Sequence, residues 1–114
     1  MANQALIVID VINGFITEGP LADPSIARII PPTVQAIEAA LNREEPVLTL
    51  RDAHDPEAAE FDAYPAHCLK DSRESQLVDE LLPYRHRMID IEKNTTNGFF
   101  AEGFQRFKIG RAHV

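Results

Sequence analysis

Three short apolar segments constrain what this chain can fold into. Residues 5–9 form a continuous apolar run that is rich in β-branched residues, and further strand-like segments follow at 46–51 and 88–92. Runs of this length and composition are typical of strands that are buried in a parallel sheet. We therefore predict three strands, and we expect the first of them to be fully buried.

Helical patterns separate these strands. Residues 32–43 repeat apolar side chains at helical spacing, and Pro32 suits a first helical turn. Residues 74–82 show a second apolar stripe, and we expect Pro83 to end that helix. The alternation of strands and helices predicts an α/β fold around a parallel sheet.

Ionisable residues follow each predicted strand. Asp10 follows the first strand, Asp52 and His54 follow the second, and Lys93 follows the third. In open α/β sheets, ligands bind beyond the carboxyl ends of the strands. We therefore expect these four side chains to meet at one edge of the sheet.

The composition is that of a small acidic globular chain. Its 114 residues allow one small domain, and its formal net charge of −7 argues against nucleic acid or an anionic membrane surface as a partner. Its apolar runs are too short to cross a bilayer. A single cysteine excludes an internal disulfide, and the N-terminus lacks a basic signal region, so we expect a cytoplasmic protein.

Residues 51–68 crowd histidines, carboxylates and the cysteine into one irregular stretch. Asp52 and His54 are two residues apart, so they point the same way in an extended segment. Imidazole and carboxylate groups together suit zinc, iron or manganese. The candidate ligands are Asp52, His54, Glu60 and His67. The alternative is a solvated acidic loop with a surface histidine.

Cys68 is the single thiol. We interpret it as a small buried apolar residue rather than as a nucleophile. The neighbouring His67 is a poor base for it, because sequence neighbours in an extended stretch face opposite ways. At the strand ends, Asp10 is a candidate general base whose orientation and pKa are set by Lys93. The alternative for Asp10 is a turn-capping role, with Lys93 in solvent.

Three segments resemble the nicotinamidase branch of the isochorismatase-like cysteine hydrolases. ALIVIDVINGFITEGPLA is similar to the family's opening strand and loop, and IEKNTTNGFFAEGF to its lysine strand. RDAHDPEAAEFDAYPAHC resembles the nicotinamidase metal stretch, with Tyr64 where tryptophan is usual and Glu60 where the third ligand is often histidine. The resemblance covers the chain to about residue 107.

The resemblance implies a Rossmann-type three-layer fold with a parallel sheet, truncated after about three strands. It implies amide hydrolysis through a cysteine thioester, in which Asp10 moves the proton and Lys93 orients and charges the pair. A bound metal, with zinc first and iron or manganese next, would bind the ring nitrogen of a carboxamide such as nicotinamide. Phe15 and Tyr64 are expected at the substrate, and the full-length form is expected to be a homo-oligomer.

This chain departs from the family pattern in one respect. The family nucleophile lies on a later segment, so Cys68 matches the cysteine beside a metal ligand and should not inherit the catalytic role. We therefore expect no nucleophile in this chain, and expect the chain itself to be inactive. Two alternatives stay open: a non-catalytic module that binds a metal or ligand, and an isochorismatase-type hydrolase, which the metal ligands disfavour.

The tail suggests why the later segment is missing. Residues 109–114 read IGRAHV, which a common sequencing-library adapter encodes in one frame (ATC GGA AGA GCA CAC GTC). An ordinary basic tail is the alternative. We expect residues 1–108 to be the N-terminal part of a longer hydrolase domain and residues 109–114 to be non-native.

Overall fold

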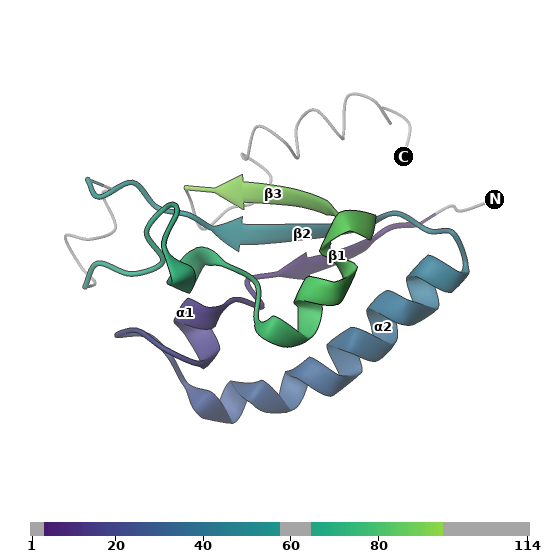
Figure 1. Ribbon diagram of the computed structural model, residues 1–114, viewed down its shortest axis with the longest axis horizontal. Coiled ribbons are helices and arrows are strands. Elements are labelled where there is room, and N and C mark those ends of the chain that lie inside the picture. Colours follow the sequence, from purple (N-terminus) through teal and green to yellow (C-terminus); the bar gives the residue numbers. More distant parts are fainter. Residues whose placement is uncertain (1–3, 58–64, 95–114) are drawn as a thin grey trace.

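The computed structural model describes residues 4–57 and 65–94, and a parallel sheet lies at its centre. The strand order is β1 (Leu6–Ile9), β2 (Val47–Asp52) and β3 (Ile89–Lys93). Figure 1 shows the three strands pointing the same way, so their carboxyl ends lie on one side of the molecule. The α/β fold with a parallel sheet that the sequence predicts is confirmed.

One long helix connects β1 to β2. This helix, α2 (Ile30–Asn42), begins two residues before the predicted Pro32 and ends one residue before the predicted position. Pro31 and Pro32 both fit in its first turn, because the N–H groups there have no partner within the helix. Two short helices precede it, α1 (Asn13–Ile16) and the 3-10 helix η1 (Pro24–Ile29).

The main core lies between the sheet and these helices. Val8 and Val47 face it from the strands, and Ile12, Ile16 and Ile37 meet them from the helical side. Figure 1 shows α1 and α2 on the same side of the sheet. Alternate strand residues point to the opposite face, where Leu48, Leu50 and Ile91 form a smaller cluster.

The prediction that β1 is fully buried is wrong. Val8 is buried, but Ile7 and Ile9 are 38% and 58% exposed. These two isoleucines lie on the face opposite the helices, and within the described residues β1 pairs with β2 alone. The apolar run therefore marks a strand correctly, but not the burial of both its faces.

The helix predicted at 74–82 is also wrong. Two 3-10 helices stand there, η3 (Arg73–Ser75) and η4 (Asp79–Arg87), and Pro83 lies inside the second instead of ending it. The chain between them is extended because it pairs with the segment after β1. Ile12 and Leu77 form an antiparallel bridge, and Asn13 N donates to Gln76 O at 3.0 Å. This tertiary pairing overrides the helical periodicity.

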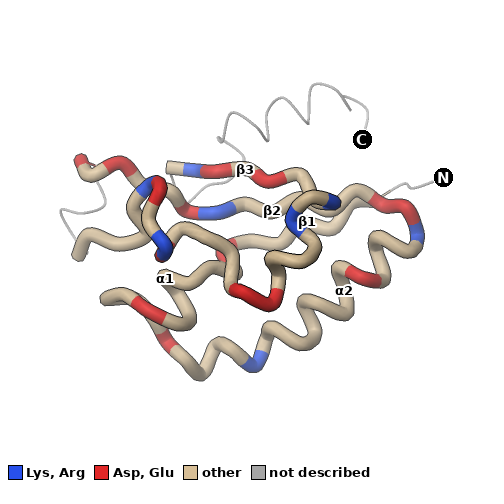
Figure 2. Tube along the Cα trace, viewed as in Figure 1, with Lys and Arg blue, Asp and Glu red and all other residues tan. Residues whose placement is uncertain are grey.

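Charged residues mark the carboxyl ends of the strands. Figure 2 shows basic and acidic segments meeting at the ends of β2 and β3. Within residues 4–57 and 65–94, no helix combines the length and the apolar character that crossing a bilayer requires. The ends of the strands are therefore the part of the fold where the candidate chemistry gathers.

Candidate active site

Lys93 joins two carboxylates at the carboxyl edge of the sheet. Its Nζ lies 3.0 Å from Asp10 Oδ2 and also forms a short ion pair with Asp52 Oδ1. The strand register explains the second contact, because Asp52 and Lys93 are paired residues of β2 and β3. The Lys93 side chain is 2% exposed. The three strand ends thus meet, as the sequence predicts.

Asp10 turns the chain at the end of β1. Its φ is +58°, in the left-handed region that aspartate tolerates better than most residues. The turn brings its Oδ1 within 3.1 Å of Asp52 N, which donates to it, while Oδ2 faces Lys93. The carboxylate is therefore oriented by a backbone N–H and an ammonium group together.

The electrostatics of this cluster favour a charged lysine and a more basic aspartate. Burial raises the pKa of Asp10, and the negative charge of Asp52 raises it further. Burial alone would lower the pKa of Lys93, but hydrogen bonds to Asp52 and Asp10 outweigh it and raise that pKa. Asp10 can therefore accept a proton more readily than an ordinary carboxylate while Lys93 stays cationic.

Three predicted metal ligands converge beside this cluster. Asp52, His54 and His67 are all buried, and one ligand atom from each lies within 4.8 Å of the others. His54 Nε2 is 3.2 Å from Asp52 Oδ2. The imidazole rings of His54 and His67 are arranged edge to face, with their centroids 5.1 Å apart. The fourth predicted ligand, Glu60, lies outside the described residues.

His67 is oriented by its own backbone. Its Nδ1 is 2.7 Å from Pro65 O, and a carbonyl oxygen can only accept a hydrogen bond. Nδ1 therefore donates this bond, and in the neutral imidazole Nε2 carries the lone pair. A histidine that donates from one nitrogen and ligates with the other is the usual arrangement at metal sites. The donor chemistry of the three residues fits a divalent transition metal.

Cys68 lies in the hydrophobic core. It is fully buried, its backbone N donates to Glu74 Oε1 at 3.0 Å, and its φ is +47°. A Cβ placed on Gly14 of α1 would collide with Cys68 Sγ, so the thiol packs directly against that helix. The predicted burial of Cys68 is therefore confirmed.

Of the two residues predicted to contact substrate, the structure describes one, Phe15. Phe15 in α1 lies beside a candidate metal ligand, since its ring centroid is 6.1 Å from that of His67. Tyr64 lies outside the described residues. Asn94, which the sequence analysis did not single out, contacts His54 and Asp55.

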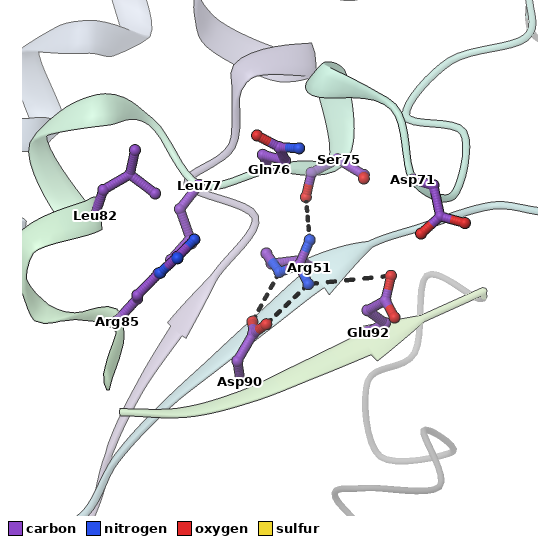
Figure 3. A pocket seen from close by; sticks show the side chains of 9 residues that line it. All are labelled: Arg51, Asp71, Ser75, Gln76, Leu77, Leu82, Arg85, Asp90 and Glu92. Atoms are coloured by element: carbon purple, nitrogen blue, oxygen red, sulfur yellow. Dashed lines mark hydrogen bonds and ion pairs between the residues drawn. The ribbon is translucent and has the colours of Figure 1, made fainter. Parts of the chain in front are cut away.

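A separate polar cavity of about 290 Å³ lies between the sheet and η3 and η4. Figure 3 shows Arg51 at its centre, bonded to Asp90 and to the carbonyl oxygen of Ser75. Of the candidate metal ligands that the structure describes, none lines this cavity. Arg51 instead ties η3 to the face of the sheet opposite Asp52.

Comparison with known proteins identifies the fold around this site. Residues 4–111 match the Isochorismatase domain. The chain belongs to the isochorismatase family. Within it, the chain is 33% identical over 86 residues to Nicotinamidase 1 of Arabidopsis thaliana, covering 70% of this chain and 35% of that protein.

Solved structures of family members share the fold. N-carbamoylsarcosine amidase from Thermoplasma acidophilum superimposes with a TM-score of 0.84 at 28% identity, covering 95% of this chain and 61% of that one. Pyrazinamidase of Pyrococcus horikoshii, solved in complex with zinc, gives 0.74 at 20% identity, with coverage of 95% and 64%. The chain thus spans less than two thirds of the length of each of these three proteins.

Proposed function

We propose that this chain is the metal-binding part of a hydrolase that converts nicotinamide, or a related heteroaromatic carboxamide, to the acid and ammonia. One observation carries the proposal: a continuous set of contacts runs from the partly exposed Asp10 through the buried Lys93 and Asp52 to His54. A base, a cation and a metal-ligand set at one sheet edge suit the hydrolysis of an uncharged amide. The similarity to a plant nicotinamidase supports the substrate class.

Asp52, His54 and His67 would hold one divalent metal, with Glu60 as the fourth ligand. Zinc is the first choice, and iron or manganese come next, because imidazole suits all three and carboxylate adds a hard oxygen. The zinc complex of the P. horikoshii pyrazinamidase supports this choice. When bound, the metal would attract the ring nitrogen of the substrate and so fix the position of the carboxamide.

Asp10 would be the catalytic base and Lys93 its partner. A cysteine thiol gives its proton to Asp10, and the thiolate attacks the carboxamide carbon to form a C–S bond. The C–N bond then breaks, and the proton passes from Asp10 to the departing ammonia. Water afterwards hydrolyses the thioester to the acid. Lys93 holds Asp10 in position and keeps positive charge beside it throughout.

Cys68 would not be that thiol. It packs against Gly14 inside the hydrophobic core and is fully buried, whereas a nucleophilic cysteine needs access to substrate and an electropositive setting. The nucleophile would therefore come from sequence outside these 114 residues, and the chain alone would be inactive. Residues 1–108 would form the N-terminal part of the domain, and residues 109–114, which lie outside the described residues, a non-native tail.

Phe15 and Tyr64 would bind the flat ring of the substrate. Phe15 has the right place for this role, because its ring lies beside the metal ligand His67, and aromatic walls suit a planar apolar ligand. The complete enzyme would act on a small-molecule substrate, and it would be a homo-oligomer.

Ammonia release tests the proposal. We would compare this chain with a version extended into the downstream reading frame, each loaded with zinc and supplied with nicotinamide. The extended protein should release ammonia, and an Asp10→Asn variant of it should lose that activity while keeping its zinc. Turnover by the short chain, or full activity of Asp10→Asn, would contradict the proposed roles. An extended protein that binds zinc but hydrolyses no carboxamide would point to the non-catalytic module.

A further inference from the structure

Asn94 lies beside the segment that carries His54, although it follows the next strand. It directly follows β3, whose pairing with β2 continues beyond the strand: Ala53 N donates to Lys93 O at 2.9 Å. This ladder holds residue 94 next to the segment 53–55. The position of Asn94 is therefore set by the backbone of two strands, not by the loop that follows.

The Asn94 amide makes contacts on both of its sides. Its Oδ1 accepts from Asp55 N at 3.0 Å, and its Nδ2 donates to Asp55 Oδ2 at 3.1 Å. The same Oδ1 lies 3.4 Å from His54 Nδ1, a contact somewhat longer than a typical N–H···O hydrogen bond. Asn94 thus forms two hydrogen bonds with Asp55, and its Oδ1 also faces the buried imidazole of His54.

The polarity of these contacts favours one position for the proton of His54. A backbone N–H can only donate and a carboxylate can only accept, so Asp55 admits one orientation of the Asn94 amide. In that orientation the oxygen faces His54 Nδ1. An amide oxygen can only accept, so this contact is a hydrogen bond only when Nδ1 carries a proton. In the neutral imidazole, Nε2 then has its lone pair on the side of Asp52 Oδ2, 3.2 Å away, and a cation between these two atoms would bind both.

We propose that Asn94 is a positioning residue that fixes His54 in the tautomer with its proton on Nδ1, and so presents Nε2 to a divalent metal. The inference rests on the proposed metal site. It extends to His54 the arrangement that Pro65 O gives His67. The Pro65 contact comes from the backbone and no side-chain variant removes it, whereas Asn94 can be changed.

Zinc affinity of the purified chain, measured by competition with a chromophoric chelator, tests the proposal. Asn94→Ala should weaken zinc binding about 10- to 100-fold, as is typical when a hydrogen-bond partner of a ligating histidine is lost. The exchange Asn94→Asp with Asp55→Asn keeps an acceptor toward His54 and a donor–acceptor pair between the two residues, so it should bind zinc nearly as the wild type does. Asn42→Ala, at an exposed asparagine in the last turn of α2, is the matched control.

The tautomer itself is read from the nitrogen chemical shifts of the His54 imidazole in the metal-free chain at about pH 8.5, where histidine is ordinarily neutral. The wild type and the exchanged pair should show the proton on Nδ1, and Asn94→Ala should show a mixture. A purely structural role of Asn94 would lower thermal stability without moving this signal.

The possible failures are distinguishable. Zinc binding and a His54 tautomer that Asn94→Ala leaves unchanged would overturn this inference alone. A wild-type chain that binds no zinc would overturn both the inference and the proposed function. An extended protein that binds zinc in an Asn94-dependent way, yet releases no ammonia from carboxamides, would overturn the proposed function and leave the role of Asn94 standing.

Discussion

Lys93 Nζ lies 3.0 Å from Asp10 Oδ2 and also contacts Asp52 Oδ1. One buried ammonium group therefore bridges the carboxylate that follows β1 and the carboxylate that ends β2. Each strand therefore supplies one charge to a shared network. The network connects the candidate base to the candidate metal ligands. Changes to any of its members should affect the stability of the sheet edge as well as its chemistry.

Replacing Lys93 should strongly destabilise the protein. Lys93→Met keeps most of the side-chain volume but leaves the buried Asp52 and the half-buried Asp10 without their cation, and breaking a buried ion pair from one side typically costs about 3–5 kcal/mol. Urea denaturation of the chain measures the loss. Lys70→Met, at an exposed lysine, is the control and should stay close to the wild type. Equal midpoints for the two variants would contradict the burial of the network.

The metal should bind through the two histidines and stabilise the fold. The double variant His54→Ala, His67→Ala should lose the metal that the wild type retains after mild dialysis, because it removes two of the three converging donors. His86→Ala, at an exposed histidine of η4, should retain it. Elemental analysis measures the metal content.

Removal of the metal from the wild type gives an independent check. Chelation should lower its melting temperature, since a ligand that binds only the folded state stabilises that state. The double variant should show no such shift. A shift of equal size in both proteins would place the metal elsewhere.

Gly14→Ala should destabilise the protein although alanine favours helices. The gain from helix propensity is at most about 1 kcal/mol. The new Cβ would collide with Cys68 Sγ and come within 3.0 Å of the Glu74 carbonyl oxygen, and overpacking of this kind costs about 1–3 kcal/mol. Thermal unfolding should show a net loss.

A second substitution tests the cause of that loss. Cys68→Ala removes the sulfur, so it should restore part of the stability that Gly14→Ala removes, in a double-mutant cycle. Additive effects of the two substitutions would mean that Cys68 does not pack against α1.

The sequence predicts the sheet better than the segments that pack on it. Three apolar runs and the charges behind them predict the strand ends within about one residue, and hence the meeting of Asp10, Asp52 and Lys93, because parallel strands bring their carboxyl ends to one edge. The helix at 74–82 fails because residues 76–78 pair with 11–13, a contact that local periodicity does not contain. The exposure of Ile7 and Ile9 likewise depends on which elements cover each face.

Within the candidate site, the sequence predicts candidate ligands but not the groups that orient them. Pro65 O acts through its backbone, so residue type gives no sign of its role. Asn94 follows Lys93 at a strand end, the same kind of position as Asp10 and His54, but its residue type alone does not indicate a role. Its contact with His54 depends on the β2–β3 register, which three-dimensional pairing fixes.

The Arg51–Asp90 pair should make stability depend on acid. Burial alone would raise the pKa of Asp90, but hydrogen bonds from Arg51 and Thr49 outweigh it and hold that pKa below its ordinary value. A carboxylate whose pKa is lower in the folded than in the unfolded state contributes stability above the unfolded value, and loses it as the pH falls toward the folded value.

Melting temperatures between about pH 7 and pH 3 should therefore fall less for Asp90→Asn than for the wild type, from a lower starting point. Glu80→Gln, at an exposed carboxylate of η4, should follow the wild-type curve. If Asp90→Asn also followed that curve, the contacts around Arg51 in Figure 3 would not stabilise the fold.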